Sequence, residues 1–232
     1  MNKLIRSLTL VATFLAAGSL SAKEGDLLPG LQPLVGQVTQ EFDQIPAERQ
    51  LVLKKAALFI RSKIQAKEAP QLTFICTHNS RRSHLSQIWA QTAAAYYDLP
   101  GVKTFSGGTE ATACNPRTVA ALTRAGFDIT NSTPDAKNPV YLVKYSGQAE
   151  PVKAFSKVYS ADGNPKENFV AFMTCDHADV NCPVVQGSLL RVPVHYKDPK
   201  VSDGTPAEAA TYDERCRQIA REMFYMMSQV NA

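Results

Sequence analysis

The sequence has 232 residues, of which 44% are hydrophobic and 20% are charged, and its formal net charge at pH 7 is +4. These values are typical of a soluble globular protein and exclude a disordered or fibrous chain. The net charge is too small to indicate nucleic-acid binding. The length suits one domain of ordinary size with additional segments.

Residues 1–22 have the pattern of a secretory signal peptide. Lys3 and Arg6 precede an apolar run over residues 8–17, and small residues follow as far as Ala22. The run is shorter than the roughly 20 residues of a membrane-spanning helix. We therefore predict cleavage after Ala22, export to the periplasm or the cell exterior, and no membrane attachment of the mature chain. An uncleaved membrane anchor is the alternative.

Residues 23–69 are predicted to form an N-terminal helical extension. Pro46 is suited to a helix start, and apolar residues recur at helical spacing from Leu51 to Ile64. We expect this segment to pack on the main domain. The alternative is a helix that docks a partner protein.

Residues 70–232 alternate strand and helix patterns and are predicted to form the catalytic domain. This alternation is typical of a three-layer α/β/α fold with a central, mostly parallel four-stranded sheet. A β-hairpin over residues 139–159 is predicted as an insertion, and a long amphipathic helix beginning near Pro206 closes one face. The predicted strands of the main sheet cover residues 72–75, 102–106, 168–174 and 189–194.

A polar loop between the first strand and the first helix of this domain carries the candidate chemistry. Cys76 ends the strand, and Arg82 and Ser83 follow after five residues. A loop of this length that leads into a helix N-terminus turns backbone N–H groups inward and binds an anion. The same field stabilises a Cys76 thiolate, to which Ser83 donates a hydrogen bond, while Arg82 grips two oxygens of the anion. The predicted oxyanion-binding residues are Thr77, His78, Asn79, Ser80, Arg81 and Arg82. The alternative is a merely buried cysteine in a chance Cys-x5-Arg pattern.

With these residues the sequence resembles the low-molecular-weight protein tyrosine phosphatase superfamily, and within it the thioredoxin-linked arsenate reductases. The resemblance covers roughly residues 71–229, and in the loop Cys76, Asn79, Arg82 and Ser83 match the family pattern. Further matches are Ser106-Gly107-Gly108-Thr109-Glu110, the segment from Asn115 to Leu122, the segment from Cys175 to Pro183, and Asp198-Pro199.

Two loop positions depart from the family pattern. His78 stands where a glycine is common, so we expect a backbone without positive φ at this position. Arg81 stands where a second cysteine is frequent, and we expect its side chain to face solvent or the rim of the substrate site.

The resemblance implies two mechanisms from one site. With arsenate, Cys76 forms an adduct, Cys175 attacks Cys76 to release arsenite, and Cys182 resolves the disulfide, with an external thiol reductant such as a thioredoxin-like protein. With a phosphorylated substrate, Asp198 protonates the leaving group and the phosphocysteine is then hydrolysed. The third possibility is an inactive module that binds phosphate or a phosphopeptide.

The chain has five cysteines, and an odd count leaves at least one free thiol. In an exported protein a structural Cys175–Cys182 disulfide is an alternative to the redox relay. Cys114 and Cys216 are predicted core or surface thiols, although the sequence leaves a bond between them open. The histidine spacing fits no metal site, so we predict no metal and no bound cofactor. By resemblance, a monovalent cation near Asn79 stays open.

Overall fold

The computed structural model describes residues 27–182 and 184–231. The predicted signal peptide lies outside the described residues and stays a prediction. Pro183, the last residue of the segment that matches the family from Cys175 onward, also lies outside them. None of the helices in the described part of the chain has the length and apolar content that crossing a membrane demands.

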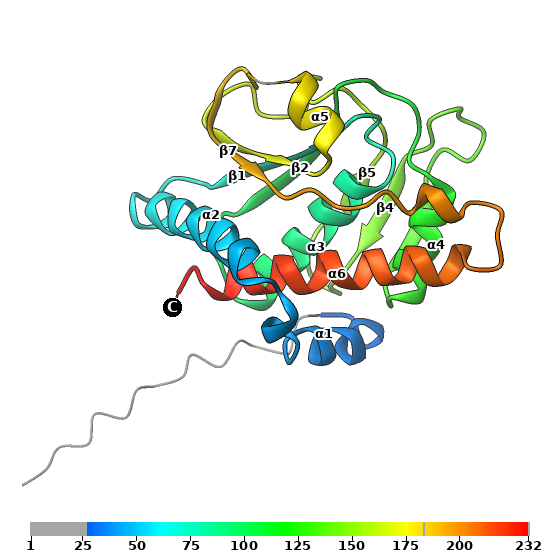
Figure 1. The fold of residues 1–232 in the computed structure, drawn as a ribbon, viewed down its shortest axis with the longest axis horizontal. Helices are drawn as coiled ribbons and strands as arrows, with labels where there is room; N and C mark the ends of the chain where they lie inside the picture. The colour runs from blue at the N-terminus through cyan, green and yellow to red at the C-terminus, as the bar shows by residue number, and fades with distance from the viewer. Residues whose placement is uncertain (1–26, 183, 232) are drawn as a thin grey trace, which may run out of the picture.

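A four-stranded, fully parallel sheet forms the centre of the molecule (Figure 1). Its strands are β1 (Gln71–Cys76), β2 (Lys103–Gly108), β6 (Phe169–Met173) and β7 (Ser188–Pro193), in the order β2-β1-β6-β7. The chain therefore adds β2 on one side of β1, and later adds β6 and β7 on the other side. This arrangement confirms the predicted sheet. The last strand is an edge strand, and Pro193 is its final residue, where a missing N–H is tolerated.

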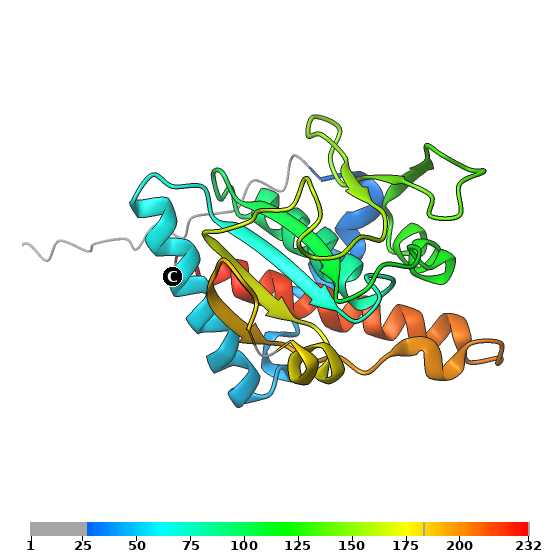
Figure 2. The same ribbon diagram turned by 90° about the horizontal axis from the view of Figure 1, so that it is seen from above.

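Helices cover both faces of the sheet, which confirms the three-layer α/β/α fold (Figure 2). Because side chains alternate along a strand, Leu72 and Phe74 join the larger core, formed with α2 (Ala47–Gln65), α3 (Arg82–Tyr96), α4 (Pro116–Arg124) and α6 (Glu208–Ser228). Ile75 and Met173 join a smaller core beneath the short helix α5 (Asp176–Asn181). Both cysteines of the predicted first exchange, Cys76 and Cys175, belong to this smaller core.

The N-terminal segment contains η2 (Pro29–Leu31), α1 (Gln32–Val38), η3 (Phe42–Gln44) and α2. Both α1 and α2 pack against α6, and Arg217 and Arg221 of α6 form ion pairs with Glu41. Helix α2 buries one side through Leu53 and Ile60. The predicted helices are therefore present, and they contribute to the larger core.

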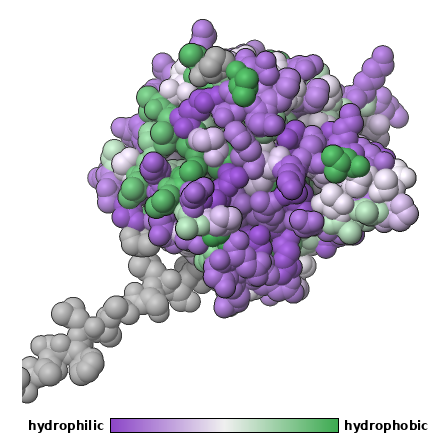
Figure 3. Space-filling view, in the orientation of Figure 1, coloured by the Kyte–Doolittle hydropathy of each residue, from purple (hydrophilic) through white to green (hydrophobic). Residues whose placement is uncertain are grey.

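Apolar side chains also gather on the outer surface over α2 and β7, on the left of Figure 3. On α2, Leu51 is 61% exposed and Leu58 is 57% exposed. The helix therefore carries apolar residues on both its inner and its outer side.

A second, antiparallel sheet has the order β3-β4-β5, with β3 (Asp128–Asn131), β4 (Tyr141–Lys144) and β5 (Val152–Ala154). The predicted hairpin is confirmed in β4 and β5, but the prediction that its second strand continues to Tyr159 is wrong, and β3 was not predicted. After Ala154 the chain turns to the main sheet, where Gly108 N–H donates to Lys157 O and Tyr159 N–H donates to Gly108 O. These bonds replace pairing with β4. The remaining short element is η4 (Pro199–Ser202).

We expect Leu53→Ala to lower the free energy of unfolding by about 2–5 kcal/mol, because this α2 side chain is fully buried. Urea denaturation measures the change. The matched control is Leu51→Ala, two residues away on the exposed side, for which we expect a change within about 0.5 kcal/mol. Equal effects of the two substitutions would show that α2 does not pack as described.

Candidate active site

The predicted anion loop lies where β1 gives way to α3, at the carboxyl end of the sheet. Strand β1 sits between β2 and β6, so this is the point at which the strand order reverses, the usual position of ligand sites in open α/β sheets. Cys76 is the last residue of β1 and is 3% exposed, and Arg82 is the first residue of α3. The structure thus places the predicted nucleophile at the helix N-terminus.

A directed chain of hydrogen bonds ends at the Cys76 sulfur. The main-chain N–H of Lys157 donates to Asn79 Oδ1 at 3.0 Å, which fixes the orientation of the Asn79 amide. Asn79 Nδ2 then donates to Ser83 Oγ at 2.9 Å. Because Ser83 Oγ already accepts this bond, its own hydrogen is free to point at Cys76 Sγ, 3.1 Å away. A sulfur that receives a hydrogen bond is stabilised as a thiolate.

The loop backbone follows the expectation for His78. Asn79, and not His78, has a positive φ, of 44°, and asparagine is among the residues that tolerate this region. The His78 side chain is 49% exposed, while its carbonyl accepts hydrogen bonds from Thr112 Oγ1 and Ser156 Oγ. The expectation of a non-positive φ at His78 is confirmed.

Segments distant in sequence hold the loop in place. Thr77 O accepts the N–H of Glu110, and Ser80 Oγ donates to Ala113 O. At Gly108 a Cβ atom would lie 2.6 Å from Thr77 O, so the loop packs directly on this glycine. The segment from Gly108 to Ala113, which includes residues that match the family pattern, therefore holds the loop in position.

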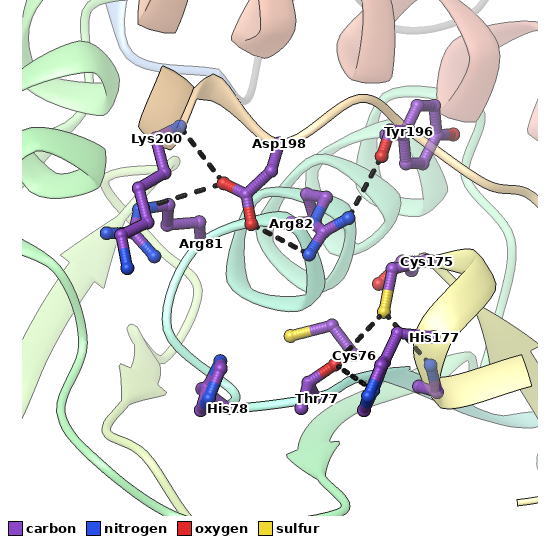
Figure 4. A network of polar contacts seen from close by, with 12 residues as sticks. Cys76, Thr77, His78, Arg81, Arg82, Cys175, His177, Tyr196, Asp198 and Lys200 are labelled. Carbon is purple, nitrogen blue, oxygen red and sulfur yellow. Dashed lines mark hydrogen bonds and ion pairs between the residues drawn. The ribbon is translucent and has the colours of Figure 1, made fainter. Parts of the chain in front are cut away.

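Arg82 is engaged by two acceptors in this structure (Figure 4). Its Nη2 lies 2.8 Å from Asp198 Oδ2, and its Nη1 donates to Tyr196 O at 3.1 Å. The third nitrogen, Nε, is buried without a hydrogen-bond partner among the described residues. An incoming oxyanion would compete with Asp198 for the guanidinium, so the two-pronged grip of Arg82 stays a prediction. The structure does bring Arg82 and the predicted general acid together.

The expectation that Arg81 faces solvent is wrong, whereas a position at the rim of the substrate site stays a prediction. Its side chain is 12% exposed, and Nε donates to Tyr212 Oη at 2.8 Å. The guanidinium also pairs with Asp203 at 3.4 Å and lies 3.9 Å from Asp198. Arg81 therefore binds α6 and the end of η4 to the loop, because these elements offer a phenol and two carboxylates within reach.

Cys175 and Cys182 lie at opposite ends of α5, and neither forms a disulfide. Cys175 is fully buried, and its Sγ lies 3.5 Å from Thr77 Oγ1 and accepts the N–H of Ala178 at 3.4 Å. Cys182 is partly exposed and lies beside Tyr159. Cys175 therefore contacts Thr77, the residue that follows Cys76 in the sequence.

Cys114 and Cys216 are buried free thiols, as predicted for core cysteines. Burial raises the pKa of each to about 12, so both are protonated at neutral pH. Trp89 Nε1 donates to Cys216 Sγ at 3.2 Å. The disulfide between them that the sequence left open is not formed.

Two residues near the loop received no role from the sequence. His84 on α3 is fully buried, its Nδ1 lies 3.2 Å from Ser106 Oγ, and burial lowers its pKa to about 3. Burial also lowers the pKa of Lys157 to about 8. No sequence signal marks Lys157, because its contribution to the loop comes from the main chain.

Among the described residues no group of three or more His, Cys, Asp or Glu side chains is arranged to hold a metal ion. The absence of a metal or cofactor from the chemistry stays a prediction. The monovalent cation near Asn79 stays open, and the Asn79 amide bonds to Lys157 N–H and Ser83 Oγ.

Comparison with known proteins finds relatives that are arsenate reductases, while no family model matches. The arsenate reductase of Bacillus licheniformis is 28% identical over 144 residues, which are 62% of this chain and 84% of that protein. That of Staphylococcus aureus is 28% identical over 127 residues, covering 54% of this chain and 76% of the relative. These relatives support the predicted superfamily and indicate an enzyme of this kind.

Solved structures similar to the chain include a low-molecular-weight phosphotyrosine phosphatase from Vibrio cholerae, with a TM-score of 0.47 and 11% identity over 69% of this chain and 95% of that one. An arsenate reductase from Archaeoglobus fulgidus has a TM-score of 0.45 and 15% identity over 68% of this chain and 98% of that one.

We expect Asn79→Asp to slow the alkylation of Cys76 by iodoacetamide about tenfold at neutral pH. A carboxylate cannot donate to Ser83, so the Ser83 hydroxyl turns to the new acceptor and leaves the sulfur, and a hydrogen bond to a charged group contributes about 1.5–3 kcal/mol. Mass mapping of the modified peptide measures the rate. Asn131→Asp on β3 is the control, and an unchanged rate in the first variant would contradict the chain.

We expect His84 to make the protein acid-sensitive. Its pKa is about 3 in the folded state against an ordinary 6.5, so the unfolded chain binds more protons between these values. The free energy of unfolding therefore falls as pH decreases through this window, by at most about 1.4 kcal/mol per unit from this residue. Urea titrations from pH 7 to pH 4 should give a smaller slope for His84→Asn. Equal slopes would contradict the assignment.

Proposed function

We propose that this protein is an arsenate reductase that uses Cys76, Cys175 and Cys182 in succession. The observation that carries the proposal is the placement of three free thiols at one end of the sheet. The first two thiols of the proposed order, Cys76 and Cys175, are buried, and the last one, Cys182, is partly exposed. The sequence relatives, which are arsenate reductases, support the same reading.

In the first step the Cys76 thiolate attacks arsenic, a sulfur–arsenic bond forms, and one arsenate hydroxyl takes up a proton from the solvent and leaves as water. The hydrogen bond from Ser83 stabilises the thiolate before attack. The loop N–H groups and the dipole of α3 favour a tetrahedral oxyanion at this position. Arg82 would exchange its bond to Asp198 for bonds to the anion.

In the second step the Cys175 thiolate attacks Cys76 Sγ. A sulfur–sulfur bond forms, the sulfur–arsenic bond breaks, and its electron pair goes to arsenic, which is reduced from As(V) to As(III) and leaves as arsenite. The two thiols supply the two electrons and become the Cys76–Cys175 disulfide. The position of Cys175 next to Thr77 suits this attack.

In the third step Cys182 attacks Cys175 and frees Cys76. The two cysteines flank a six-residue helix, so their Cα atoms lie about 10 Å apart at 1.5 Å per residue. A disulfide needs a Cα separation below about 7 Å, so α5 has to unwind before the bond forms. The resulting Cys175–Cys182 disulfide is then reduced by an external dithiol.

We propose further that residues 1–22 direct export and that the dithiol donor is a thioredoxin-like protein of the same compartment. The pattern of Lys3, Arg6 and the apolar run supports export. The mass of the N-terminal peptide in protein from the exported fraction tests the cleavage after Ala22.

Hydrolysis of phosphomonoesters is the second candidate, and Asp198 favours it. The Asp198 side chain is 30% exposed and lies against Arg82, where its protonated form could transfer the proton to a leaving group. The third possibility, an inactive binder of phosphate or phosphopeptides, predicts no turnover of either substrate.

The proposed function is tested by assaying purified protein with arsenate and a dithiol donor. We expect arsenite formation to be abolished in Cys76→Ser and Cys175→Ser, whereas Cys182→Ser stops after about one arsenite per chain with a Cys76–Cys175 disulfide. Cys216→Ser is the control, because that buried thiol lies in the larger core beside Trp89 and has no step in the proposed order.

Two results would contradict the relay. One is arsenate turnover that persists in Cys175→Ser and Cys182→Ser. The other is hydrolysis of an aryl phosphate that depends on Cys76 and Asp198 alone, with no arsenite formed, which would favour the phosphatase.

A further inference from the structure

Cys175 faces a chemical problem in the proposed reaction, because its sulfur is fully buried and must lose a proton before it can attack. Among the described residues Sγ has two polar neighbours, Ala178 N–H and Thr77 Oγ1. The first is a donor and cannot take a proton. The Thr77 hydroxyl is therefore the group through which the proton can leave.

The Thr77 hydroxyl has a second partner, the imidazole of His177. His177 Nδ1 lies 3.2 Å from Thr77 Oγ1, so the hydroxyl stands between the buried thiol and this ring (Figure 4). When Nδ1 of a neutral imidazole accepts the hydroxyl hydrogen, the hydroxyl oxygen is free to accept from the thiol. The His177 side chain is exposed, so a proton taken up there reaches water.

We propose that His177 is a positioning residue that takes the proton of Cys175 through Thr77, and the proposal rests on the proposed arsenate reduction. The S–H proton of Cys175 moves to Thr77 Oγ1 as the hydroxyl proton moves to His177 Nδ1. The products are a Cys175 thiolate, an intact Thr77 hydroxyl and a His177 imidazolium. The new thiolate keeps the hydrogen bond from Ala178 N–H and gains one from Thr77.

The surroundings of α5 leave His177 as the base for this step. Strands β1 and β6, on which the helix packs, carry no charged side chain, and their titratable neighbours are Cys76 and Cys175. On the helix itself, Asp176 Oδ1 accepts the His177 main-chain N–H. Asp179 of the helix pairs with Arg191 and with His195, and the other titratable neighbours are Cys182 and Tyr159 at the far end of the helix.

The test follows the arsenate-driven Cys76–Cys175 disulfide in a single turnover from pH 5.5 to pH 9, by quenching and mass mapping. We expect His177→Ala to slow its formation about tenfold or more at pH 7, a modest share of the 10²–10⁴-fold typical of proton-transfer groups. Added imidazole should restore the rate in proportion to its concentration, because the site of the missing ring is exposed. Thr77→Val should show the same loss without rescue, and Thr77→Ser should keep the wild-type rate.

His195→Ala is the matched control, since it removes an exposed histidine that pairs with Asp179 and does not contact Thr77. A wild-type rate and pH profile in His177→Ala would overturn the inference. So would a loss that free imidazole leaves unchanged, because that result indicates a structural role.

A second measurement separates this inference from the proposed function. In a Cys76→Ser background, iodoacetamide labelling of Cys175 needs no arsenate, and we expect the same dependence on His177 and the same rescue. If wild-type protein forms no arsenate-driven disulfide but the labelling depends on His177, the arsenate proposal fails and the proton path stands. If the labelling is independent of His177, the path fails whatever the substrate.

Discussion

The hydrogen bond from the Lys157 main chain to Asn79 Oδ1 determines the direction of the other hydrogen bonds that lead to Cys76. An amide side chain can present either oxygen or nitrogen to its neighbours, and only a partner of fixed polarity decides between them. The Lys157 N–H is such a partner. Once it sets the Asn79 amide, Ser83 Oγ accepts from Asn79 and its own hydrogen is free to point at Cys76 Sγ.

The same loop supports two kinds of chemistry through its two flanks. On one side Arg82 contacts Asp198, the pair that a phosphatase would use. On the other side Thr77 contacts Cys175 and His177, groups that matter only if a second thiol reacts. Cys175 is itself the N-cap residue of α5, so in the proposed relay the helix that protects its sulfur is also the helix that would unwind for Cys182 to reach it. The folded helix α5 keeps the Cys175 sulfur buried, whereas the proposed reaction with Cys182 requires the same helix to open.

The sequence predicted the sheet and the loop because both depend on local patterns. Apolar runs and helix starts have short-range signatures, and the Cys76-to-Ser83 spacing is itself the signature of an anion loop. The sequence did not predict the contacts between distant segments. Arg81 was misjudged because Tyr212 and Asp203, 131 and 122 residues further along the chain, take up its guanidinium. The role of Lys157 was missed because a main-chain N–H leaves no mark in the amino-acid sequence.

The turn of the chain after β5 brings two consecutive residues to the loop by different means. Ser156 reaches His78 O with its side chain, and Lys157 reaches Asn79 with its main chain. In extended backbone successive residues point to opposite sides, so losing or adding one residue between Ala154 and Ser156 would present the wrong group at each contact. The length of the segment that follows β5 is therefore constrained by its contacts to a loop some 80 positions earlier in the chain, and any graft or deletion in this region has to respect that constraint.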